Sequence, residues 1–271
     1  MPRHVHRRRL LARRGLSLAE LLVSVAVLTI IAGVLGGLAT AVQTSSDYSQ
    51  GNALTVQHTR VAQERVARAV AEAYSTGAYP AAVAVYEVVG GWRFPDTLVV
   101  WNPTAAPTNA NGPPLVRELV IFCPDPADPR RLLEITAPGD ARTVQLNEQL
   151  NTPAGRTLIA GIKSSADSKT VVLSNLLRTA TVSGATRGCL RFERELHPSD
   201  SAWQSYLGGT TTWSDLVWPQ GAGGSTAGMR QIWVRYEWQM MPGESAAAED
   251  PSGQQAVTFF GSAGCRSRLN Q

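Results

Sequence analysis

A single carboxylate, Glu20, lies at the start of a long apolar run. Two arginines and a glycine, Arg13, Arg14 and Gly15, come shortly before it in the sequence. From Leu21 to Ser46 the sequence has no charged residue. A charge at the edge of a membrane-length apolar segment is costly unless it reaches water or meets an opposite charge. Glu20 is therefore either a carboxylate that reaches the lipid headgroups or one that has a specific partner.

Residues that could perform catalysis are few. His197, Ser199 and Asp200 are close in sequence, but a catalytic triad needs residues that converge from separate segments, so a capped turn is the favoured interpretation. The sequence has no HExxH, no phosphate-binding GxxxxGK[ST], no GxSxG and no GxGxxG. We therefore expect no enzymatic activity and no cofactor.

The sequence gives little support for a metal site and does not decide whether a disulfide forms. Asp125 and Asp128 in CPDPADP could bind a cation, but two spaced carboxylates among three prolines are typical of a turn, and we expect no metal site. Cys123, Cys189 and Cys265 form no CxxC pair, which argues against a zinc ribbon. In an exported chain, one disulfide in any of three pairings or three buried thiols would both fit.

The charge of the chain is concentrated at its N-terminus. Six of the 25 basic residues lie within residues 1–15, which contain no acid, and this leaves 19 basic residues against 21 acidic ones. The remainder is nearly neutral, so the overall charge of +4 does not indicate nucleic-acid binding.

The apolar run Leu21–Val42 is long enough to cross a bilayer as a helix, and the preceding arginines would keep that end in the cytoplasm. A cleaved secretory signal is one interpretation, with Ala39-Thr40-Ala41 as the cleavage site, although the run is longer than usual for such a signal. An uncleaved signal anchor is another, but it gives Glu20 no role.

A third interpretation comes from a resemblance. The sequence from Gly15 to Leu22, GLSLAELL, resembles the class III signal of type IV pilins and type II secretion pseudopilins. The resemblance implies cleavage by prepilin peptidase between Gly15 and Leu16 and N-methylation of Leu16. It also implies that Glu20, fifth in the mature chain, pairs with the N-terminal ammonium of a neighbouring subunit. Leu16 departs from the commoner Phe or Met, and the resemblance covers only residues 13 to about 45.

An amphipathic pattern continues beyond Asp47 and predicts one helix from about Leu16 to Ala73, ended near Gly77 and Pro80. We expect residues 1–15 to be a leader, 16–44 the membrane or filament half of the helix, 45–76 its amphipathic half and 77–271 a head domain. The apolar positions expected to face the head are Val56, Val61, Ala62, Val66, Ala69, Val70 and Ala73.

The head has the sequence pattern of β-structure, so the predicted fold class is α+β, with the long helix packed on an antiparallel sheet. Ile232, Val234, Tyr236 and Trp238 alternate with Trp233, Arg235 and Glu237, and Gly90-Gly91 suggests a hairpin turn. We expect Trp203, Trp213, Trp218 and Tyr206 to be buried under a long loop. The predicted strands are Val83–Val89, Thr97–Trp101, Arg117–Cys123, Arg131–Thr136, Thr157–Ile162, Cys189–Glu195, Gln231–Gln239 and Ala256–Phe260.

Together these features suggest a minor pilin-like subunit, because a bulky, loop-rich head suits a low-copy subunit. It resembles the large W-type minor pilins, and the J-type pseudopilins of type II secretion and competence pseudopili are alternatives.

The implied partners are other pilins or pseudopilins, prepilin peptidase and an inner-membrane assembly platform, with nucleic acid not expected as a direct ligand. The expected location is the bacterial inner membrane, with the N-terminus cytoplasmic, and then a periplasmic or surface filament. An exported or anchored binding protein or enzyme with a coincidental motif is the alternative from another class.

Overall fold

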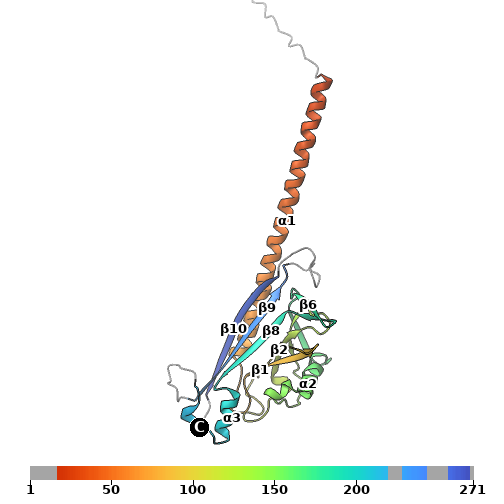
Figure 1. Ribbon diagram of the computed structural model, residues 1–271. Helices are drawn as coiled ribbons and strands as arrows, with labels where there is room; N and C mark the ends of the chain where they lie inside the picture. Colours follow the sequence, from red (N-terminus) through yellow and green to blue (C-terminus); the bar gives the residue numbers. More distant parts are fainter. Residues whose placement is uncertain (1–16, 219–227, 243–255, 269–271) are drawn as a thin grey trace, which may run out of the picture. The chain divides into compact units, whose positions relative to one another are not determined.

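The computed structural model describes residues 17–218, 228–242 and 256–268, and the chain divides after Gln50 into two compact units (Figure 1). Helix α1 (Leu18–Ala71) is continuous over 54 residues, which confirms the predicted uninterrupted helix. Every described side chain from residue 17 to residue 50 is exposed. The remainder of the chain, from Gly51, contains the packed core.

The largest sheet has five antiparallel strands in the order of the sequence. The predicted Gly90-Gly91 turn is confirmed: it joins the first two strands, and both glycines have positive φ angles of 57° and 82°, which glycine adopts without steric cost. The strands are β1 (Ala82–Val89), β2 (Trp92–Trp101), β3 (Leu119–Pro124), β4 (Leu132–Thr136) and β5 (Lys169–Ser174).

A second, three-stranded antiparallel sheet has the order β10-β9-β8. Its strands are β8 (Leu190–His197), β9 (Met229–Met240) and β10 (Val257–Arg268), and a separate hairpin pairs β6 (Thr179–Val182) with β7 (Ala185–Gly188). The alternation predicted for the central strand is confirmed, because Ile232, Val234, Tyr236 and Trp238 are all at most 5% exposed.

Two apolar cores cover opposite faces of the five-stranded sheet. Leu98, Phe122 and Leu132 face the end of α1 and the inner side of the three-stranded sheet. The neighbouring residues Val99 and Ile121, one position along each strand, face the other way toward helix α2 (Pro153–Lys163). This alternation is the period-2 geometry of a strand buried on both sides.

The face that α1 buries differs in part from the predicted one. Ala62, Val66, Ala69 and Val70 are buried as expected, but Val56 and Val61 are about half exposed. Gly51, Thr55 and Thr59 are buried instead, and the Thr55 hydroxyl donates hydrogen bonds to the carbonyls of Gly51 and Met241.

The strand predicted at Thr157–Ile162 is wrong: this segment belongs to helix α2 (Pro153–Lys163). Thr152 caps the helix by accepting a hydrogen bond from the Gly155 amide, and Pro153 occupies the first turn, where its missing N–H costs nothing. The buried Ile159 and Ile162 follow helical spacing. Further short elements are α3 (Asp200–Leu207) and the 3₁₀ turns η1 (Val116–Glu118), η2 (Glu148–Asn151) and η3 (Trp213–Asp215).

Candidate functional site

The first half of α1 is the segment in which sequence and structure together suggest a function. Its length and composition are sufficient to cross a membrane, and none of its most apolar stretch is buried within the chain. A membrane anchor and a signal sequence fit this finding equally well. The helix runs without interruption through Ala39-Thr40-Ala41. Gly15 and Leu16, the residues of the predicted cleavage and methylation, lie outside the described residues.

Glu20 forms a reciprocal hydrogen-bonded ring with Ser17 at the N-terminus of α1. The Ser17 amide donates to Glu20 Oε2 at 2.9 Å, and the Glu20 amide donates to Ser17 Oγ at 3.2 Å. This is a capping box, in which Ser at the N-cap and Glu three residues later satisfy each other's free amides. The sequence signal, Ser-x-x-Glu before an apolar run, was available and was missed. Glu20 thus has a local role in addition to any intermolecular one.

All three cysteines lie within the described residues, and all three are free thiols. Cys123 and Cys265 are buried in the two different cores and Cys189 is partly buried, so the structure favours the alternative of three unpaired thiols. Burial raises the pKa of Cys123 to about 12 and that of Cys265 to about 11. Both thiols therefore stay protonated and unreactive at neutral pH.

His197, Ser199 and Asp200 do not converge on a common point. His197 Nε2 lies 2.9 Å from Glu195 Oε1, and Ser199 caps α3 by accepting a hydrogen bond from the Ala202 amide. Asp200 is held in two ion pairs with arginines. Their roles are structural, in agreement with the predicted capped turn.

Asp125 and Asp128 are occupied within their own loop. Asp125 accepts a hydrogen bond from the Ala127 amide, and Asp128 pairs with both Arg130 and Arg131. Within the described residues, no group of three or more His, Cys, Asp or Glu side chains is placed to hold a metal ion.

The tryptophan-rich stretch forms a small core of its own. Trp203 and Trp218 are about 95% buried, and the rings of Trp213 and Trp218 lie 4.6 Å apart. Tyr206 packs against the same group. The prediction that these aromatic side chains are buried is confirmed for the two tryptophans, while Trp213 and Tyr206 are partly buried.

Buried arginines were not found from the sequence. Arg230, 3% exposed, donates to the carbonyls of Thr76 and Gly77, and it pairs with Asp200 at 2.7 Å. Burial lowers the pKa of Arg230, and the Asp200 carboxylate partly offsets this effect. Arg230 thereby fixes the segment that follows α1 to β9 and α3. Nothing local in the sequence marks this role, because Asp200, Gly77 and Thr76 are 30, 153 and 154 positions away from Arg230.

A second ion cluster joins the small hairpin to the five-stranded sheet. Arg187 donates to Glu87 and Asp96 at 2.6 Å each, and Lys163 donates to Thr97 at 2.7 Å. Burial raises the pKa of Asp96 despite these cations. The cluster lines a cavity of about 170 Å³, and its charges largely compensate one another.

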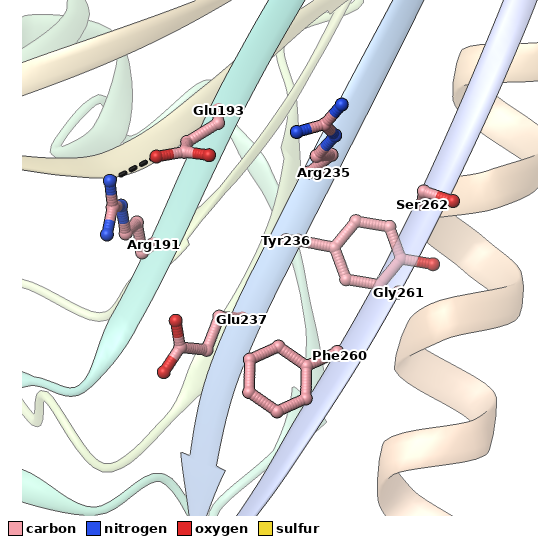
Figure 2. Close-up of a pocket in the computed structure, with 8 residues that line it drawn as sticks. All are labelled: Arg191, Glu193, Arg235, Tyr236, Glu237, Phe260, Gly261 and Ser262. Carbon is pink, nitrogen blue, oxygen red and sulfur yellow. Dashed lines mark hydrogen bonds and ion pairs between the residues drawn. The ribbon is translucent and has the colours of Figure 1, made fainter.

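The outer face of the three-stranded sheet carries a larger groove of about 450 Å³ (Figure 2). Its charged lining comes from Arg191 and Glu193 on β8 and from Arg235 and Glu237 on β9, and Phe260 on β10 completes it. Figure 2 shows the side chains of Arg191 and Glu193 directed toward each other, with Glu237 and Phe260 further along the sheet. Of these residues, Arg235 and Glu237 were predicted from the alternation of β9 to share its outward face, but the groove itself was not predicted.

Comparisons with protein-family models, curated proteins and solved structures found no match for this chain. Any functional conclusion therefore depends on the residues and geometry described above.

Proposed function

We propose that this chain is a minor pilin-like subunit of a type IV pilus, cut after Gly15 by prepilin peptidase and assembled through its N-terminal helix. The observation that carries the proposal is the position of Glu20, fifth after Gly15 in GLSLAELL and immediately before the apolar run. The uncharged stretch from Leu21 to Ser46 supports it, because all of it lies in one helix.

The continuity of α1 also supports assembly rather than release. Cleavage after Ala41 would divide the helix internally, and it would discard the capping box formed by Ser17 and Glu20. Cleavage after Gly15 leaves that box within the mature chain and creates a new ammonium at Leu16. In the apolar layer, an ammonium and a carboxylate relieve each other's desolvation only when they pair.

The mature subunit would remain in the inner membrane through α1 until it enters a filament with other pilins. Its head, with two apolar cores and long connections, suits a low-copy position. No catalytic activity and no cofactor form part of the proposal.

Mass spectrometry of the mature N-terminus tests this function directly. We expect a chain that begins at Leu16 with one methyl group on its amino nitrogen. A chain that begins at Val42 would overturn the proposal in favour of a secreted protein, and an intact N-terminus would favour a simple anchor.

A further inference from the structure

The groove on the outer face of the three-stranded sheet contains a carboxylate, Glu237, that has no partner among the described residues. Arg191 pairs with Glu193, and Arg235 pairs with Glu195 at 2.7 Å. The side chain of Glu237 makes no hydrogen bond or ion pair with any other described residue. No ion pair therefore neutralises this carboxylate within the part of the head that the structure describes.

An exposed aromatic ring lies beside this carboxylate. Phe260 is directly opposite Glu237 across the β9–β10 pair, and it is 71% exposed. On the other side, Arg191 is directly opposite Glu237 but is already engaged by Glu193. A carboxylate next to an aromatic face attracts cations, because the ring carries partial negative charge on its face.

We propose that this groove binds a lysine or arginine side chain of a partner protein, with the cation held between the Glu237 carboxylate and the Phe260 ring. The two arginines of the groove do not oppose such a cation strongly, since each is neutralised by its own glutamate. An acidic group would instead meet the Glu237 carboxylate, which has no ion-pair partner among the described residues. The site is thus complementary to positive charge.

A protein partner is favoured over a free cation because the same face of β9 also exposes a large aromatic side chain. Trp233, on the same face of β9, is 39% exposed and could extend the contact. Exposed ion pairs and cation–π contacts are individually weak, so this site would orient a larger interface rather than supply most of its affinity. The inference concerns the head alone and does not depend on cleavage after Gly15 or on filament assembly.

The test measures binding of hexalysine to the full chain in an uncharged detergent, by calorimetry at low ionic strength. Three variants are compared with wild type: Glu237→Gln, Phe260→Leu and the control Glu72→Gln. Glu72, just after α1, is an exposed glutamate that likewise has no ion pair with a described residue, and Glu72→Gln changes the net charge by the same amount as Glu237→Gln. We expect Glu237→Gln and Phe260→Leu each to weaken binding about two- to fivefold, and Glu72→Gln to have little effect.

If Glu237→Gln and Glu72→Gln weaken hexalysine binding equally, the protein attracts the polycation only through its general charge, and the proposed site is contradicted. Binding unchanged by Phe260→Leu, or no measurable binding to wild type, would overturn it as well. Circular dichroism of each variant distinguishes a lost site from a lost fold, and both substituted groove side chains are at the surface, where such changes rarely affect folding.

Discussion

At the scale of single residues, Glu20 has two roles that must be separated. The capping box with Ser17 explains why a carboxylate is tolerated at the start of an apolar helix without any second subunit. The proposed pairing with the ammonium of Leu16 in a neighbouring subunit requires the negative charge itself. Glutamine can replace glutamate in a capping box but cannot neutralise an ammonium, so it distinguishes the two roles.

We expect both Glu20→Gln and Glu20→Ala to insert into the membrane but to be lost from sheared filaments by about tenfold or more. This loss follows because an unpaired charge within the apolar layer costs about 2.5–3.5 kcal/mol. Immunoblots of membrane and filament fractions measure the distribution. Wild-type incorporation of Glu20→Gln would show that capping is the whole role of this residue.

At the scale of elements, the pairing of β9 with β10 depends on close packing over a glycine. The Tyr236 ring lies over Gly261, where an added Cβ would approach Tyr236 Cε2 to 2.1 Å. The ring also stacks on Trp238, with centroids 4.8 Å apart and planes 19° from parallel. The aromatic layer leaves no space for a side chain at position 261.

Gly261→Ala is therefore expected to lower the free energy of unfolding by about 1–3 kcal/mol, as overpacking does in other cores. Gly139→Ala is the matched control, because a Cβ there meets no atom within 4 Å, and a change within about 0.5 kcal/mol is expected. Urea unfolding of the full-length variants, followed by tryptophan fluorescence, measures both. Equal stability of the two variants would contradict the packing described for Tyr236.

At the scale of the whole molecule, the head cannot be separated from the second half of α1. Ala62, Val66 and Val70 are completely buried, and they belong to the same core as Phe192 and Trp238. The ion pair of Arg65 with Glu134, at 2.5 Å, joins α1 to β4 as well. The compact unit accordingly begins at Gly51 rather than after the helix.

A chain that starts at Gly51 is expected to fold and to unfold cooperatively in urea, whereas one that starts at Pro80 is not. The shorter chain lacks the buried side chains that α1 contributes to the core, and it exposes the core surface that they cover. The loss of each such side chain typically lowers the free energy of unfolding by about 1 kcal/mol or more. Circular dichroism and tryptophan fluorescence during urea titration measure the difference. A cooperative transition in the Pro80 chain would show that α1 contributes little to the head.

The sequence alone determined the features that depend on local periodicity. The long helix, most of the strands and the inward face of β9 follow from the spacing of apolar residues, which sets which side chains share a surface. The segment Thr157–Ile162 was misjudged because a short apolar run fits a strand or a helix, and the cap at Thr152 and Pro153 decides between them. The capping box at Ser17 and Glu20 was also local and could have been found.

Only the tertiary structure decided which face of α1 is buried, where Thr55 and Thr59 replace the expected Val56 and Val61. It alone placed Arg230 against the carbonyls after α1, and it left the Glu237 side chain beside Phe260 with no partner among the described residues. The physical reason is the same in each case. Burial and ion pairing are set by groups that are distant in sequence, and their approach depends on how whole elements pack, which no local pattern encodes.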